Sequence, residues 1–302
     1  MMIQILLLNG IHYGKLVRKN PRKTKHIFQT RGMEDMSTPY HTVLTIAGSD
    51  SGGCAGIQAD IKSISANGGY AASVITATTA QNTQGITDIH PIPVAHIIKQ
   101  MEAVLEDIDF AAVKIGMLHS SEVIEAVKST LTRYNIINIV LDPVMIATSG
   151  DNLINDNAIE SLKLFLPNVT LITPNIPEAE LLIGHSINLK NMEASAKELA
   201  EKYHTSVLLK GGHLEFSDEM TDILYNFESK QSTTIHNKAI NSINTHGTGC
   251  SLSSSIATYL SLGFSLEDAT LKGCNYLNVA IEKGKDKTLG KGHGPVNHFG
   301  LA

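Results

Sequence analysis

The chain has 302 residues, is 42% hydrophobic and 18% charged, and carries a formal net charge of −5. A chain of this length can bury a sizeable core without disulfides or metal ions, and its ordinary apolar content excludes disorder as the global state. No uninterrupted apolar run reaches the roughly 18 residues that a membrane-spanning helix needs, which excludes a membrane protein.

The first 33 residues hold seven Lys or Arg and no acid, so the rest of the chain is acidic. An acidic body gives no reason to expect nucleic-acid binding. The basic arm is compatible with a targeting or nucleic-acid-binding segment. We favour a simpler interpretation of residues 1–36, as a disordered extension or as upstream sequence from a start codon placed too early. Met33 and Met36 both lie just before the first predicted strand.

The three cysteines, Cys54, Cys250 and Cys274, are widely separated and form no CxxC pair. This spacing supports neither a disulfide framework nor a zinc ribbon. We therefore expect a reducing, cytoplasmic location.

From residue 40 onwards, short β-rich runs alternate with longer stretches in which apolar residues recur at helical spacing. In chain order we predict a strand at 43–47, a helix at 55–66, a strand at 72–77, a helix at 94–105, a strand at 112–115, a helix at 121–134, a strand at 137–141, a helix at 157–165, a strand at 169–173, helices at 177–183 and 192–203, a strand at 206–210, a hairpin at 221–226 and 233–236, and helices at 249–262 and 266–283. Ser120 or Ser121 is expected to cap the helix at 121–134.

Strands that alternate with helices indicate βαβ units and a mostly parallel sheet covered by helices on both faces. The predicted parallel strands are nearly all apolar, as burial on both faces requires. No internal repeat and no linker follows residue 40. We therefore predict one α/β domain over residues 37–302.

Polar and glycine-rich residues collect after the predicted strands, at 48–53, 142–143, 173–175, 210–213 and 245–250. Ligands of open α/β sheets bind beyond the carboxyl ends of the strands, so these loops predict one shared site. Residues 247–250, Gly-Thr-Gly-Cys, precede a predicted helix, where main-chain amides and the helix dipole favour an anion. An ordinary helix start capped by Thr248 is the alternative. Neither a GxxxxGK[ST] loop nor a GxGxxG fingerprint occurs.

Several segments carry a family resemblance: LTIAGSD at 44–50, AGIQAD at 55–60, AQNT at 80–83, KIGM at 114–117, VLDPVM at 140–145, ITPN at 172–175 with Glu178, KGGH at 210–213 and HGTGC at 246–250. In this order they resemble hydroxymethylpyrimidine/phosphomethylpyrimidine kinases of the ribokinase-like superfamily, over roughly residues 42–299. The resemblance implies a three-layer α/β/α sandwich, a homodimer and MgATP-dependent phosphoryl transfer. The implied reaction phosphorylates 4-amino-5-hydroxymethyl-2-methylpyrimidine to its monophosphate and then to its diphosphate in thiamine biosynthesis.

The resemblance also implies roles for individual residues at the phosphate end of the site. Amides of Gly247, Gly249 and Cys250 would hold the transferred phosphoryl group. Lys210 would neutralise the ATP phosphates. The remaining contacts with the cofactor would come from Asn175, Thr248 and Asp142. Mg²⁺ would be held by Asp142 and Glu178, directly or through water. Helix and turn capping is the alternative role of these two carboxylates.

At the substrate end, Gln81 offers a donor and an acceptor that match the ring nitrogen and amine of an aminopyrimidine, a contact that the resemblance assigns to it. Asp60 is expected to bind a polar group of the substrate. The close walls of the pocket are expected to include Gly48, Ala55, Met117 and Val144. Cys54 departs from the family, whose members commonly have glycine there, and adds a side chain beside the predicted pocket.

Cys250 lies where many members of the superfamily carry an aspartate base. Because a helix N-terminus lowers the pKa of a thiol, we expect that a thiolate can form and accept the hydroxyl proton. A thiol also avoids repelling the second substrate, which is already an anionic phosphate monoester. An inert buried cysteine is the alternative.

Two other functions remain open at this stage. Pyridoxal kinase shares the fold and the anion site, although related pyridoxal-selective enzymes often lack the Ala-Gln-Asn segment around Gln81, and dual use is possible. A catalytically silent protein that senses the pyrimidine is a rival of a different class. The presence of Cys250, Lys210, Asp142 and Glu178 argues against a sensor, which has no need of groups for phosphoryl transfer.

Overall fold

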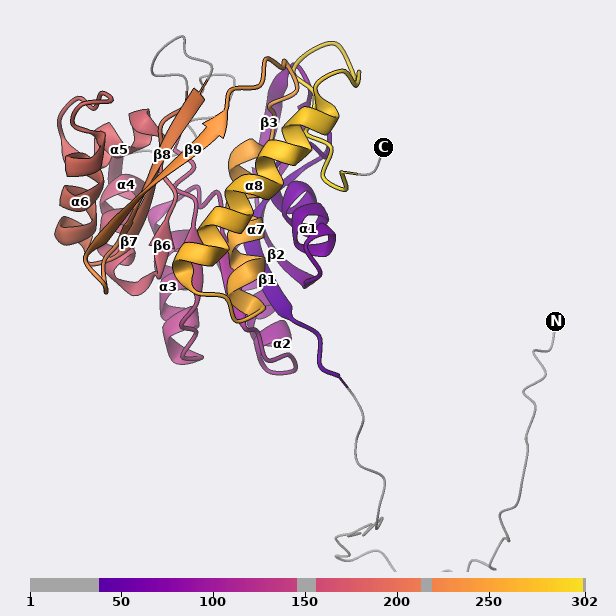
Figure 1. Ribbon diagram of the computed structural model, residues 1–302. Coiled ribbons are helices and arrows are strands. Elements are labelled where there is room, and N and C mark those ends of the chain that lie inside the picture. The colour runs from indigo at the N-terminus through magenta and orange to yellow at the C-terminus, as the bar shows by residue number, and fades with distance from the viewer. Residues whose placement is uncertain (1–37, 146–155, 213–218, 301–302) are drawn as a thin grey trace, which may run out of the picture. The chain divides into compact units, whose positions relative to one another are not determined.

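A computed structural model describes residues 38–145, 156–212 and 219–300 (Figure 1). Contacts divide the chain into Met1–Pro39 and Tyr40–Ala302, and the fold described below is that of the second unit. The predicted extension, residues 1–36, and His213 of the KGGH segment lie outside the described residues. The domain boundary at residue 37 therefore stays a prediction.

The strands of the described residues form one nine-stranded sheet in the order β3-β2-β1-β4-β5-β6-β7-β8-β9. Neighbours from β2 to β7 are parallel, whereas β3, β8 and β9 pair in antiparallel fashion. The strands are β1 (Thr42–Asp50), β2 (Tyr70–Asn82), β3 (Gly85–Pro91), β4 (Ala112–Ile115), β5 (Ile139–Leu141), β6 (Leu171–Ile172), β7 (Ser206–Lys210), β8 (Glu219–Asn226) and β9 (Gln231–Lys238). The predicted mostly parallel sheet is confirmed.

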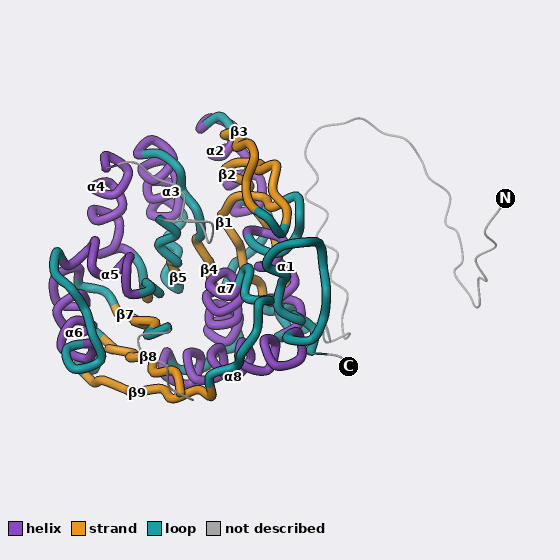
Figure 2. Tube along the Cα trace, turned by 90° about the horizontal axis from the view of Figure 1, so that it is seen from above, coloured by secondary structure: helices purple, strands orange, loops and turns teal. Residues whose placement is uncertain are grey.

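Helices cover both faces of the sheet, and each face has its own apolar core (Figure 2). One core joins the sheet to α2–α6, and the other joins it to α1, α7 and α8. The helices are α1 (Gly56–Ala66), α2 (Val94–Leu105), α3 (Ser121–Arg133), α4 (Asp156–Phe165), α5 (Ile176–Ile183), α6 (Met192–Tyr203), α7 (Thr248–Ser261) and α8 (Leu266–Gly284). The arrangement confirms the predicted three-layer α/β/α sandwich.

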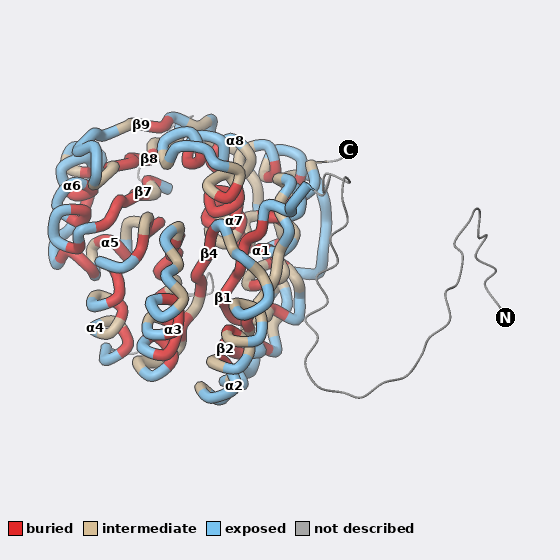
Figure 3. Tube along the Cα trace, turned by 90° about the horizontal axis from the view of Figure 1, so that it is seen from below, coloured by how far each residue is buried: buried red, intermediate tan, exposed pale blue. Residues whose placement is uncertain are grey.

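The parallel strands β1, β4, β5, β6 and β7 are almost completely buried, whereas most residues of β2 are exposed or half-buried (Figure 3). All four residues of β4 are buried, and so are eight of the nine residues of β1. The ninth, Ser49, is partly exposed. Burial on both faces explains why these strands are continuous apolar runs. Among the helices of the described ranges, none has the length and apolar character needed to cross a bilayer.

Strand β3 is the one described strand that the sequence did not predict. Its residues are mostly exposed, and Gly85, Asp88 and Pro91 all lower strand propensity, so no apolar alternation marks it. It pairs with the end of β2, which continues to Asn82, beyond its predicted end at 77. Ser120 caps α3 as predicted, since its hydroxyl accepts a hydrogen bond from the Val123 amide.

Candidate active site

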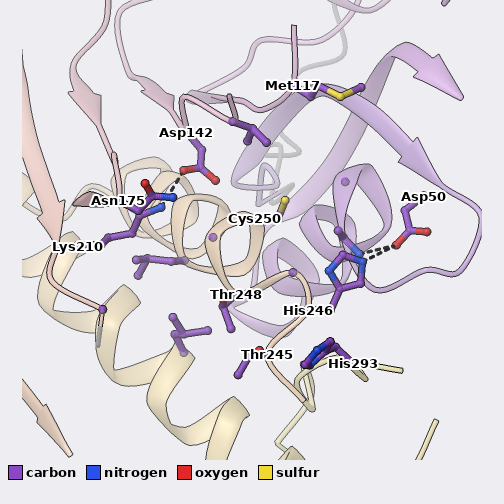
Figure 4. Close-up of a pocket in the computed structure, with 18 of the residues that line it drawn as sticks. Asp50, Met117, Asp142, Asn175, Lys210, Thr245, His246, Thr248, Cys250 and His293 are labelled. Carbon is purple, nitrogen blue, oxygen red and sulfur yellow. Dashed lines mark hydrogen bonds and ion pairs between the residues drawn. The ribbon is translucent and has the colours of Figure 1, made fainter. Parts of the chain in front are cut away.

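A pocket of about 1040 Å³ lies beyond the carboxyl ends of the parallel strands, where the loops predicted a shared site (Figure 4). Every predicted site residue lines it except Asp60. The lining residues among the predictions are Gly48, Ala55, Gln81, Met117, Asp142, Val144, Asn175, Glu178, Lys210, Gly247, Thr248, Gly249 and Cys250. Folding thus brings together residues that are spread over some two hundred positions of the sequence.

The start of α7 turns main-chain nitrogens toward this pocket. Gly247 has a φ of 82°, and a Cβ at this position would collide with the Cys54 carbonyl. No side chain caps the helix, and within the described residues the amides of Gly249 and Cys250 donate to no acceptor. Free amides at the positive end of a helix dipole make this position suitable for binding an anion.

Asp142 and Lys210 form an ion pair beside the start of α7. The Lys210 Nζ atom donates to Asp142 Oδ1 over 3.1 Å, and the Thr173 hydroxyl donates to the same oxygen over 3.0 Å. Burial alone would lower the pKa of Lys210, but the charges of Asp142 and Glu178 outweigh it and raise this pKa. Lys210 is therefore a permanent cation at the edge of the anion site.

Glu178 and Asn175 form a capping box at the start of α5. The Asn175 side chain accepts from the Glu178 amide, and the Glu178 carboxylate accepts from the Asn175 amide, each over 2.9 Å. The capping role weighed for Glu178 is thus present, and both side chains also line the pocket. Because Asn175 commits its oxygen to the cap, its side-chain NH₂ is the part left for a ligand.

The surroundings of Asp142 and Glu178 fit a divalent cation. Burial, with a smaller contribution from the charge of Asp142, raises the pKa of Glu178 to about 7 against the opposing charge of Lys210, and a bound cation would favour the ionised carboxylate. Asp142 Oδ2 faces the first turn of α7, 2.9 Å from where a Cβ on Gly249 would stand. In the described part of the chain no group of three or more His, Cys, Asp or Glu could hold a metal. Mg²⁺ would need water and phosphate oxygens as further ligands.

Gln81 lies at the other end of the pocket, near the end of β2. Its Nε2 atom is 2.8 Å from Nε2 of His246, and its Oε1 atom accepts from the Thr79 hydroxyl over 3.0 Å. Gly48 and Met117 also line the pocket and pack closely, because a Cβ on Gly48 would stand 2.7 Å from the Met117 Cε atom.

Asp60 differs from its prediction. Its carboxylate is completely buried and bound by Lys114 Nζ, 2.8 Å from each oxygen, and by the hydroxyls of Thr45 and Ser254. With its oxygens engaged and no exposed surface, Asp60 has no direct contact to offer a substrate. It holds Lys114, a fully buried residue of the pocket lining.

Cys250 also departs from its prediction. Burial outweighs the nearby Lys114 charge and, with the charges of Asp60 and Asp142, raises the pKa of the Cys250 thiol to about 11. The expected thiolate is therefore not the resting form near neutral pH. A neutral thiol agrees with the other expectation for Cys250, that this residue does not repel an anionic substrate.

Sequence reasoning missed several residues of the pocket. An apolar section is lined by Ile240, Leu277 and Ile281, two of them one turn apart on α8. Such spacing is ordinary for a helix face that packs on a core, so the pattern carried no sign of a ligand. His246 belongs to the HGTGC segment, yet nothing in the sequence indicated that it meets Gln81.

A model of the phosphomethylpyrimidine kinase family matches residues 50–297 of the chain. The chain is 48% identical over 266 residues to the thiamine biosynthesis bifunctional protein ThiED of Geobacter sulfurreducens, a match over 86% of this chain that spans about half, 53%, of that relative. It is 40% identical over 261 residues to the hydroxymethylpyrimidine/phosphomethylpyrimidine kinase of Bacillus subtilis, covering 86% of this chain and 95% of the relative.

Two solved structures are similar as well. A phosphomethylpyrimidine kinase from Clostridium difficile matches with a TM-score of 0.70 and 42% identity, over 80% of this chain and 99% of its own. A pyridoxal kinase from Staphylococcus aureus, in complex with AMP-PCP and pyridoxal, matches with a TM-score of 0.79 and 29% identity, over 87% of this chain and 95% of its own. The match to the family model covers most of the sequence, and the chain belongs to the phosphomethylpyrimidine kinase family.

Proposed function

We propose that this chain transfers the terminal phosphoryl group of ATP to 4-amino-5-hydroxymethyl-2-methylpyrimidine, and then to the resulting monophosphate, as a step of thiamine biosynthesis. One observation carries the proposal: a single pocket has free main-chain amides and Lys210 at one end and the Gln81 amide at the other. Cys250 lies between Lys210 and His246 in the view of Figure 4. The relatives from Bacillus subtilis and Clostridium difficile support the choice of substrate through their names.

At the phosphate end, phosphoryl transfer requires positioning and charge stabilisation more than covalent chemistry. The amides of Gly249 and Cys250 would bind oxygens of the phosphoryl group in transit, and Lys210 would bind the phosphates of the nucleotide. Asn175 and Thr248 would hold the nucleotide in place. Mg²⁺, held by Asp142 and Glu178 directly or through water, would neutralise charge on the phosphates.

At the substrate end, Gln81 would hold the edge of the pyrimidine while Gly48, Ala55, Met117 and Val144 close on its faces. The hydroxymethyl group would then lie near Cys250 and the start of α7. Because the transition state for phosphoryl transfer is loose, the hydroxyl proton leaves late and no strong base is needed. A neutral Cys250 thiol would then orient this hydroxyl by hydrogen bonding.

Pyridoxal is the second candidate substrate, and the similarity to a pyridoxal kinase structure favours it. Gln81 separates the two, because its donor and acceptor pair matches the adjacent ring nitrogen and amine of the aminopyrimidine. Pyridoxal has no amine next to its ring nitrogen, so we rank it second.

Release of ADP, measured in parallel with hydroxymethylpyrimidine, its monophosphate and pyridoxal, tests the proposal. We expect turnover with both pyrimidines and a lower kcat/KM with pyridoxal. Turnover with pyridoxal alone would contradict the proposal, and no turnover with any of the three would favour a non-catalytic sensor. Repeating the assay without Mg²⁺ tests the proposed cation.

We also propose a homodimer that acts in the cytoplasm. The resemblance to the family supports the dimer, and the three cysteines, all free in the described residues, support a reducing compartment. Sedimentation velocity of the purified full chain measures the oligomeric state directly.

A further inference from the structure

We propose that His246 is a positioning residue that fixes the Gln81 amide and so decides which hydrogen-bonding edge a substrate must present. This role rests on the proposed function, because it takes the ligand of Gln81 to be an aminopyrimidine. His246 lies just before α7, on a different segment from Gln81, and both side chains line the pocket.

The Gln81 amide is held from both sides. Gln81 Nε2 donates to His246 Nε2 over 2.8 Å, and the Thr79 hydroxyl, whose single proton is shared with the Ser49 carbonyl, lies 3.0 Å from Gln81 Oε1. A primary amide has two N–H donors and two acceptor sites on oxygen. One donor and one acceptor are used by the protein, which leaves one of each, in a fixed order, for the ligand.

His246 is a largely buried residue whose main chain is fixed just before α7. Its main-chain nitrogen donates to the Gly294 carbonyl over 3.1 Å, and its side chain is only 12% exposed. Because an amide nitrogen can only donate, we take His246 Nε2 as the acceptor and place the proton of the neutral ring on Nδ1, a buried atom for which the described residues supply no hydrogen-bond partner.

Two charged or titratable groups face this ring. The Asp50 carboxylate lies 3.9 Å from its Nε2 atom, and His293 lies beside it in the C-terminal segment (Figure 4). Burial lowers the pKa of His246 and, with His293, outweighs the opposing charge of Asp50. The imidazole is therefore neutral and able to accept at neutral pH.

The fixed order of donor and acceptor selects the substrate edge. A 4-aminopyrimidine presents an amine donor beside a ring-nitrogen acceptor, which pairs with the oxygen and the N–H of the amide. The 4-oxo analogue presents an acceptor beside an N–H donor, and it would fit only if the amide turned over. In the turned amide, the oxygen would face the lone pair of His246 Nε2. His246 thus disfavours the 4-oxo edge, because the amide oxygen that this edge requires would be repelled by the lone pair of the ring.

The test compares kcat/KM for the 4-amino substrate and its 4-oxo analogue in the full-length enzyme. In the His246→Leu variant we expect the ratio of the two values to fall about tenfold, the amount expected for loss of one buried hydrogen bond. In His246→Gln, whose Oε1 replaces the accepting Nε2, we expect the ratio to stay near the wild-type value. His293→Leu removes a neighbouring imidazole that does not contact Gln81, and it should leave the ratio unchanged.

Thr79→Val covers the case in which His246→Leu does not fold. It removes the other hydrogen bond to the amide with little change of shape, and the ratio should fall there too. An unchanged ratio in a folded His246→Leu or Thr79→Val variant overturns the role. Nitrogen-15 NMR of the histidine rings is independent of turnover: a proton on Nε2 of His246 would also overturn it. By contrast, a wild-type enzyme that fails to phosphorylate either pyrimidine refutes the proposed function, not the state of the ring.

Discussion

At the scale of single residues, Lys114 and Asp60 form a completely buried ion pair. Neither side chain has exposed surface, and both oxygens of Asp60 are 2.8 Å from Lys114 Nζ. Burial alone would lower the pKa of Lys114, but Asp60 reverses this and raises it. Removing one partner therefore leaves the other as an uncompensated buried charge.

We predict that Lys114→Met lowers the free energy of unfolding by about 3–5 kcal/mol, the amount typical of breaking a buried ion pair. Urea denaturation of the purified variant measures this loss. The double variant Lys114→Met/Asp60→Leu removes both charges and should regain part of it. A loss below about 1 kcal/mol in the single variant would show that the pair does not stabilise the fold.

Cys250 carries a second prediction at this scale. Replacing it with Asp places a permanent negative charge beside the acceptor, so kcat/KM for the monophosphate should fall about tenfold more than that for the unphosphorylated pyrimidine. Cys250→Ser is the uncharged control of similar size and should affect both steps alike. Equal losses in the Asp variant would contradict a role for charge at this position.

At the scale of elements, the start of α7 depends on the conformation of one glycine. Gly247 has a φ of 82° and lies against the Cys54 carbonyl, whereas Gly263, just beyond the end of the same helix, has a φ of 84° with no atom within 4 Å of an added Cβ. A substitution would therefore strain the backbone at both glycines, but an added Cβ would collide with another atom only at Gly247.

We predict that Gly247→Ala lowers kcat by about a hundredfold or more, because the collision displaces the amides that bind the phosphoryl group. Gly263→Ala is the matched control and should lose some stability but little activity. Steady-state kinetics with thermal unfolding of both variants measures the difference. Equal kinetic losses would show that strain, not the position of the amides, controls the rate.

At the scale of the whole molecule, buried imidazoles make stability depend on pH. Burial, with a smaller effect of Lys62, lowers the pKa of His298 to about 4. Between about pH 6.5 and pH 4 the unfolded chain therefore binds a proton that the folded chain does not. The free energy of unfolding falls as the pH falls through this window, by about 3 kcal/mol from His298 alone.

The His298→Gln variant isolates this contribution. The raised pKa of Glu178 acts in the opposite direction, since a folded-state pKa of about 7 favours folding at low pH, so only the difference between variant and wild type is informative. We predict that the variant loses less stability than the wild type between pH 6.5 and pH 4. Urea denaturation across this range measures it, and parallel curves would count against a neutral buried His298.

Local pattern was enough to predict most elements of the fold. Helices α2 and α6 and strands β4 and β7 begin and end where apolar periodicity predicted, because each buries a face whose spacing is written in a few consecutive residues. The sequence did not predict the edge strand β3, because its pairing with β2, not its own composition, makes it a strand. The rule that loops at the carboxyl ends of parallel strands share one site is confirmed for the loops after β1, β5, β6 and β7, whereas the fifth segment, 245–250, reaches the pocket from beyond the antiparallel strand β9.

The sequence by itself determined the layered α/β architecture and the place of the pocket, because these follow from short-range periodicity and chain direction, and the resemblance of its segments to a known family pointed to thirteen of the lining residues. Only the tertiary structure decided how those residues act on one another. In the folded protein Asp60 is buried in an ion pair with Lys114, and His246 contacts Gln81. Burial raises the pKa of Cys250, although the helix start alone predicted a lower pKa. Burial and contacts between distant segments control these properties, and neither is encoded in the local order of residues.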